Sequence, residues 1–145
     1  MQKIERNKDK TYDIRIDWLV DLSLGELGEA TLADILTSKK IEVKTDLFWQ
    51  KTGNIALEIY CNGKPSGIQS SKSDFWAIVN SYDGEVGNII ILPTASLKRF
   101  AKRVYQNINN YPNCRIVQGG DSKAATILLM PLEMAINHLK LLRED

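Results

Sequence analysis

Cysteine and histidine are scarce in this chain, and their scarcity excludes one class of site. The 145 residues contain two cysteines, Cys61 and Cys114, and one histidine, His138. A structural zinc site needs four such ligands at characteristic short spacings. We therefore expect no structural zinc centre, two reduced cysteines and no chemistry at His138.

Long apolar runs and an excess of one charge are also missing. No apolar run approaches the about 20 residues that cross a bilayer. The first residues, MQKIERNKDKTYD, contain no apolar segment of the kind that a secretory signal needs. The formal net charge is +1, so any binding of nucleic acid has to come from local patches. We expect a cytoplasmic protein with no membrane partner.

What remains is the composition of an ordinary globular protein. Hydrophobic residues make up 43% of the chain and charged residues 26%, which suits one buried core. We find no internal repeat, low-complexity tract or interdomain linker. The sequence therefore predicts a single domain over residues 1–145, with the polar residues 1–10 loosely ordered.

The spacing of apolar residues predicts alternating helices and strands. Ser23 and Glu26 form a capping box that opens a helix over residues 24–37. Two strands follow, and then the tight-turn pair Asn62-Gly63. Next we expect a short strand at 64–69 and a second helix, which starts at Ser70 or Ser71 and buries Phe75 and Trp76. A central strand at 88–92 and a third helix follow, the helix capped by Thr94 and ending at about residue 108. The last elements are strands at 114–118 and 126–130 and a C-terminal helix that begins at Pro131. The fold class is α/β, a mixed sheet flanked by helices.

The stretch from Ile41 to Tyr60 is the most informative. IEVKTD and GNIALEIY both alternate polar and apolar residues, so each predicts a strand with two different faces. If the connection Leu47–Gly53 folds back as a hairpin, the polar faces meet. They carry Glu42, Lys44, Asp46 and Glu58.

Two interpretations of that polar face stand side by side. Carboxylate oxygens are natural ligands of Mg²⁺, and a nearby ammonium group steadies developing negative charge. The same pattern is typical of a hairpin whose polar face is simply solvated. The strands alone do not decide between them.

The order of elements resembles the core of the PD-(D/E)xK nuclease superfamily, the restriction-endonuclease-like fold. The resemblance is carried by GELGEATLADIL, IEVKTD, TGNIALEI and KPSGIQSSKSDFW. It continues weakly through ILPTASLKRFAKRVY and RIVQGGDSKAATILLMPLEMA, and is closest to small phage and prophage nucleases. It implies DNA cleavage with Mg²⁺, or Mn²⁺ as a substitute, in a bacterial host cell or as a phage-encoded protein.

The resemblance also assigns residues. Glu29 matches the first-helix glutamate, Asp46 the motif aspartate and Glu58 the acid of the (D/E)xK element. These three are the expected metal ligands. Glu42 begins a literal ExK triplet in a second register, with Asp34 as its upstream acid, and stays a lesser catalytic candidate.

The chain departs from the family pattern at one position. The residue two after Glu58 is Tyr60 and not lysine. Lys44, on the same strand face as Asp46, and Lys72, at the start of the expected second helix, are the two candidates for a displaced lysine. Strand parity favours Lys44.

The expected partner is DNA. Lys98, Arg99, Lys102 and Arg103 form i,i+4 basic pairs on one helix, which are typical of a solvated face but in a nuclease would contact phosphates. We expect a homo-oligomer, with Phe48, Trp49 and Tyr105 as candidate interface anchors. The alternatives to a Mg²⁺-dependent DNA endonuclease are a non-catalytic DNA-binding or interaction protein on the same scaffold, favoured by the missing lysine, and an RNA endonuclease.

Overall fold

The chain folds into two compact units, which are described separately. The computed structural model describes residues 14–120 and 122–141, so the expectation for residues 1–10 lies outside it. The first unit, within residues 1–38, consists of helix α1 (Ile14–Ser38). This helix begins ten residues before the predicted start at residue 24 and ends where predicted. Its leucines at 24, 27, 32 and 36 are exposed.

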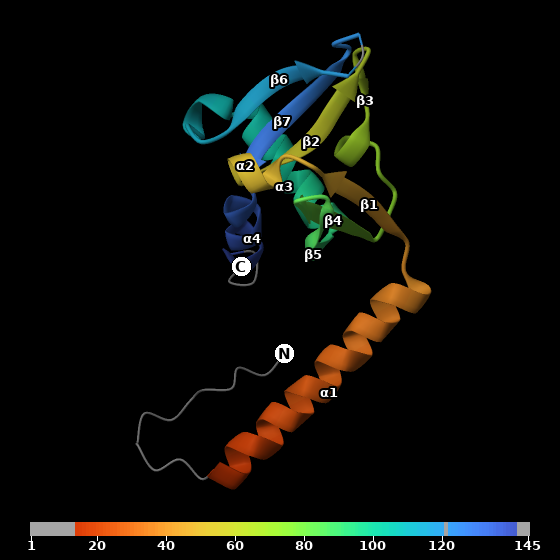
Figure 1. Cartoon of the computed structure of the whole chain (residues 1–145), viewed down its shortest axis with the longest axis vertical. Helices are drawn as coiled ribbons and strands as arrows, with labels where there is room; N and C mark the ends of the chain where they lie inside the picture. The colour runs from red at the N-terminus through yellow and green to blue at the C-terminus, as the bar shows by residue number, and fades with distance from the viewer. Residues whose placement is uncertain (1–13, 121, 142–145) are drawn as a thin grey trace. The chain divides into compact units, whose positions relative to one another are not determined.

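The second unit, residues 39–145, contains two sheets (Figure 1). In the first sheet β1 (Ile41–Asp46) runs parallel to the central strand β4 (Phe75–Tyr82), which is antiparallel to β5 (Glu85–Pro93). The second sheet is antiparallel, in the order β3 (Lys64–Pro65), β2 (Asn54–Cys61), β7 (Ala125–Pro131) and β6 (Arg115–Gly119). The α/β class is confirmed, but the strands form a mixed sheet and a separate antiparallel sheet.

The core of this unit lies under helices α3 (Thr94–Gln106) and α4 (Leu132–Leu141). The apolar face of α3 carries Leu97, Phe100 and Val104, which belong to one buried cluster with side chains of β2, β4 and β7. Three short helices, α2 (Trp49–Thr52), η1 (Gly67–Gln69) and η2 (Ile108–Asn110), connect the longer elements. The predicted third helix, the last two strands and the C-terminal helix are confirmed to within one or two residues, except that α3 ends at Gln106 and η2 follows it.

The predicted hairpin between residues 41 and 60 is wrong. β1 and β2 belong to different sheets, because the connection between them forms α2 and redirects the chain. Gly53 ends this helix in the left-handed conformation, with φ of +68°, which glycine adopts at no steric cost. The three strands expected between residues 41 and 69 therefore do not form one sheet, although β2 and β3 do pair antiparallel.

The predicted second helix is also wrong. Residues 75–82 form β4, and a run of aromatic and β-branched side chains suits a strand covered on both sides. Ser71 does not cap a helix, since its hydroxyl bonds Glu42. Thr94 does not cap α3 either, because it is the first residue of that helix and its Oγ1 lies 2.8 Å from Ser73 Oγ.

The strand expected to lie centrally at 88–92 is instead at an edge. Among the described strands β5 pairs with β4 alone, and Val86 and Ile89 are exposed. β4 takes the central place because β1 and β5 both pair with it.

Candidate functional site

The predicted polar face of β1 exists, and it lies on the buried side of the first sheet. Residues directly opposite one another in paired strands point to the same side. Glu42, Lys44 and Asp46 therefore share a face with Trp76, Ile78 and Asn80 of β4, all three of which are buried. Glu42 and Lys44 are exposed at the sheet edge, whereas Asp46 is buried.

Asp46 is held in place by the start of α2. Its Oδ1 accepts hydrogen bonds from Phe48 N at 2.8 Å and Trp49 N at 2.9 Å. Its Oδ2 accepts no hydrogen bond from any residue that the structure describes. One oxygen is thus fixed by the backbone and the other is uncommitted.

Glu58 of β2 likewise has one carboxylate oxygen that accepts a hydrogen bond and one that accepts none from a described residue. Ser66 Oγ donates a hydrogen bond to Glu58 Oε1 at 2.5 Å. No described residue bonds its second oxygen. The side chain is half-buried.

A β-bulge in β2 determines to which face of the strand Tyr60, the residue two after Glu58, points. Glu58 lies opposite Ile127, whereas Tyr60 lies opposite the adjacent Thr126. Adjacent residues of a strand point to opposite faces, so Glu58 and Tyr60 do too. The Tyr60 ring packs against Tyr105 of α3, with centroids 5.6 Å apart. Simple alternation along β2 would place residues 58 and 60 on one face, but the bulge separates them, so a lysine at position 60 would also point away from Glu58.

The segment Ser66–Asp74 connects the two sheets and binds an acid of each. Ser66 bonds Glu58, and Ser71 Oγ donates to Glu42 Oε2. Lys98 Nζ donates to Ser71 O at 2.6 Å, which fixes the segment to α3. Glu42 and Glu58 are therefore positioned by one connection. Sequence reasoning missed Ser66 and took Ser71 for a helix cap, although both stand in the quoted stretch KPSGIQSSKSDFW.

Gly67 sets how closely this segment approaches β2. Its φ is +53°, and a Cβ built there would lie 2.5 Å from Glu58 O and 2.7 Å from Glu58 Cβ. Only glycine allows the turn to lie directly on the backbone of the acid.

The remaining predicted site residues, Glu29 and Lys72, are exposed. Glu29 lies on α1, in the other unit, and is exposed. Lys72 is exposed in the connecting segment. Within residues 14–120 and 122–141, no three Asp, Glu, His or Cys side chains gather where they could bind one metal ion. Asp46 and Glu58 fit a hard divalent cation in donor chemistry, but the described residues do not assemble the predicted carboxylate triad.

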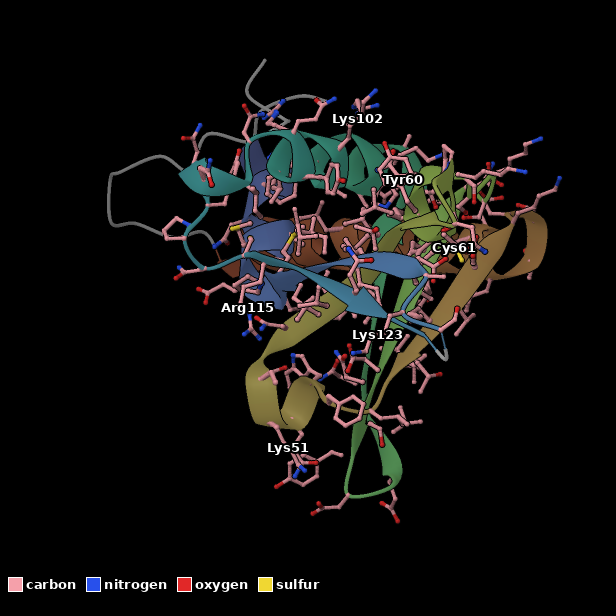
Figure 2. The ribbon with its side chains drawn as sticks, turned by 90° about the horizontal axis from the view of Figure 1, so that it is seen from above. Lys51, Tyr60, Cys61, Lys102, Arg115 and Lys123 are labelled. Atoms are coloured by element: carbon pink, nitrogen blue, oxygen red, sulfur yellow. The ribbon has the colours of Figure 1, made fainter. Side chains whose placement is uncertain are left out.

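The basic residues of α3 divide into two kinds. Lys98 is half-buried and its ammonium group is bonded to Ser71 O, so a phosphate would have to compete for it. Arg99, Lys102 and Arg103 are exposed. Figure 2 shows Lys102 on the outer side of α3, pointing away from the sheets. Three of the four predicted DNA contacts are thus accessible.

His138 has a structural role in the core. Its ring stacks on Phe100, with centroids 3.9 Å apart and an angle of 7° between the planes. Burial lowers the pKa of His138 below its ordinary value of 6.5, and the positive charges of Arg103 and Arg99 lower it further. The folded state therefore favours the neutral ring.

This shift predicts a pH dependence of stability. The unfolded chain binds the proton more readily, so the contribution of His138 is fully present above pH 6.5 and is lost as the pH falls below that value. We expect the free energy of unfolding, from urea titrations at pH 7.5, 6.5 and 5.5, to fall more steeply in the wild type than in His138→Phe. Equal slopes for the two proteins would contradict the shift.

Neither cysteine forms a disulfide, and burial raises the pKa of the Cys114 thiol. No helix among the described residues is long and apolar enough to span a membrane.

Comparison of the chain with protein-family models, with curated proteins and with solved structures gives no match. The fold and the contacts above are therefore the basis for a functional assignment.

Proposed function

We propose that this protein is a Mg²⁺-dependent DNA endonuclease with a restriction-endonuclease-like core. The observation that carries the proposal is the shared state of Asp46 and Glu58. Each has one oxygen fixed by a hydrogen bond and a second oxygen to which no described residue donates. Acids that are oriented but left half-free are suited to hold a cation, because their geometry is set before the cation arrives.

The proposed roles follow from these positions. Asp46 and Glu58 would each offer one oxygen to a metal ion. A bound Mg²⁺ would supply Lewis-acid stabilisation of the charge that develops on the phosphate. Glu42, held by Ser71 at the exposed edge of β1, would orient water or a second ion. Exposed Arg99, Lys102 and Arg103 would contact DNA phosphates without reading sequence.

A non-catalytic DNA-binding protein on the same scaffold is the alternative. It rested on the absence of lysine at position 60. Because the bulge directs Tyr60 toward α3, the identity of that residue says little about the charge around Glu58. The RNA endonuclease alternative has no observation in its favour.

An oligomer is also part of the proposal. Of the three predicted anchors, Phe48 is exposed beside α2, whereas Trp49 and Tyr105 are half-buried and pack against the core. Leu47 and Val43 are further exposed apolar side chains. A second copy would cover such side chains, and a two-fold protein would match a two-fold DNA site.

A nicking assay tests the proposal. Supercoiled plasmid, linear duplex and branched DNA are incubated with the protein and Mg²⁺, Mn²⁺ or EDTA, with single-stranded RNA as competitor. We expect cleavage of DNA with either metal and none with EDTA. Binding of DNA without cleavage under any metal condition would favour the non-catalytic alternative. Cleavage of RNA alone would favour the RNA endonuclease.

The displaced lysine can be identified by mutation. Lys44 is exposed on the same strand face as Asp46, and Lys72 projects from the connecting segment. Neither ammonium group bonds a described residue, so either is free to act. We expect Lys44→Ala to lose most of the single-turnover cleavage rate at saturating Mg²⁺ while it keeps its affinity for DNA, and Lys72→Ala to lose less. The reverse ranking would assign the role to Lys72.

A further inference from the structure

One row of side chains across the first sheet is polar, buried and incompletely bonded. Asp46 of β1 lies opposite Asn80 of β4, which lies opposite Asn88 of β5. The three side chains therefore point to the same, buried side of the sheet. Asn80 is 0% exposed and Asp46 is 9% exposed. On the same face of β4, Ile78 is apolar, and Trp76 carries the other buried polar atom of the described residues that has no hydrogen-bond partner, Nε1.

The side-chain amide of Asn80 is oriented by one hydrogen bond. Its Nδ2 donates to Asn88 Oδ1 at 2.7 Å, so the nitrogen is directed toward β5. The nitrogen and oxygen of an amide diverge from the same carbon, so the oxygen of Asn80 is directed away from the Asn88 oxygen that its nitrogen bonds. Asn80 Oδ1 is buried, and none of the described residues donates a hydrogen bond to it.

The register thus places two residues that each carry such an oxygen opposite one another, and no described residue donates to either oxygen. Asp46 Oδ2 accepts no hydrogen bond from a described residue, and Asn80 Oδ1 accepts none. A buried acceptor without a partner is rare in native proteins and calls for a missing donor or ion. A carboxylate oxygen next to an amide oxygen is a ligand pair that hard divalent cations accept.

We propose that Asn80 is a ligand of a divalent cation that it shares with Asp46, and that Asn88 is the positioning residue which aims the amide oxygen of Asn80 at the ion. The inference rests on the proposed function for the choice of Mg²⁺ or Mn²⁺, and it adds a neutral ligand from β4 to the acids expected from the sequence. Water completes the coordination, as is usual for Mg²⁺.

The arrangement has a physical rationale. Asp46 already uses one oxygen to bond the amides of Phe48 and Trp49, so it offers a single oxygen to a metal. A neutral amide oxygen adds a ligand without adding repulsion between like charges. Because Asn88 and the start of α2 fix the two ligands from opposite sides, little ordering is left for the binding step.

Nuclear magnetic resonance on the unmodified protein gives the first test. Paramagnetic Mn²⁺ broadens signals of nearby groups, so substoichiometric Mn²⁺ should broaden the side-chain amides of Asn80 and Asn88 and the backbone amides of Phe48 and Trp49. The side-chain amide of Asn107, which bonds Arg103 O at the end of α3, serves as an internal control and should stay sharp. Excess Mg²⁺ should restore the broadened signals.

Affinity measurements on variants give the second test. Asn80→Asp adds a charge to the ligand set and should tighten Mn²⁺ binding about tenfold, whereas Asn80→Ala should weaken it about tenfold or more. Asn107→Ala is the matched control and should leave the affinity unchanged. Thermal unfolding without metal shows whether each variant is folded. If Asn80→Ala does not fold, the resonance experiment on the wild-type protein still tests the inference.

The outcomes separate this inference from the proposed function. Broadening at Asn80 without DNA cleavage supports the cation site and overturns the nuclease. Cleavage with sharp Asn80 signals supports the nuclease and overturns the site, since a buried water would then be the partner of Asn80 Oδ1. Binding of Mn²⁺ near Glu42 and Ser71 alone also overturns it.

Discussion

Asp46→Asn and Glu58→Gln are each expected to reduce Mg²⁺-dependent cleavage by more than about a hundredfold while the fold persists. Both substitutions keep the oxygen that is already bonded, to Phe48 N and Trp49 N in one case and to Ser66 in the other. They remove the negative charge that a cation would need. Cleavage rates at saturating Mg²⁺, together with thermal unfolding curves, measure the two effects separately.

The choice of variant matters because of what Asp46 does for the fold. Asp46→Ala would leave two amides at the start of α2 without their charged acceptor, at a cost of about 2 kcal/mol in the free energy of unfolding. Loss of activity in that variant would therefore be ambiguous. Glu85→Gln, at an exposed acid of β5, is the matched control and should cleave at the wild-type rate. Full activity in Asp46→Asn would refute the assignment.

Gly67→Ala is expected to have the largest effect on stability. The new Cβ would meet Glu58 O at 2.5 Å and Glu58 Cβ at 2.7 Å, in a backbone conformation that alanine disfavours. Strain in the left-handed region and overpacking against β2 together predict a loss of about 3 kcal/mol. The midpoint of a urea titration measures it.

Gly53→Ala is the matched control, because it introduces the same backbone strain without overpacking against β2. Gly53 has a similar φ of +68°, but a Cβ there would have nothing within 4 Å. Its expected loss is about 1 kcal/mol, from backbone strain alone. Equal losses in the two variants would show that the close approach of Gly67 to Glu58 does not matter.

Several elements were readable from the sequence because local chemistry specifies them. Leu97, Phe100 and Val104 recur at helical spacing, and α3 forms where that spacing predicts. The alternation of Ile55, Leu57 and Ile59 predicted a strand with one buried face, and all three are buried in β2. Patterns of this kind depend only on the period of the side chains.

The pairing of strands was not readable. IEVKTD predicted a strand but not its neighbour, because the partner of β1 lies more than thirty residues along the chain, at Phe75–Asn80. The run FWAIV predicts a helix as readily as a strand, because a short apolar run fits a buried strand and a buried helix equally well. Where β4 forms is decided by the two strands that pair with it.

The sequence by itself determined the α/β class, the alternating strands and the candidate acids, since each follows from the type and spacing of neighbouring residues. Only the tertiary structure decided which groups meet. It placed Asn80 opposite Asp46, bound Ser66 to Glu58 and Ser71 to Glu42, and turned Tyr60 away from Glu58. These contacts arise from strand register, from a bulge and from a turn built on Gly67. Such features depend on packing between distant segments, which no local pattern encodes.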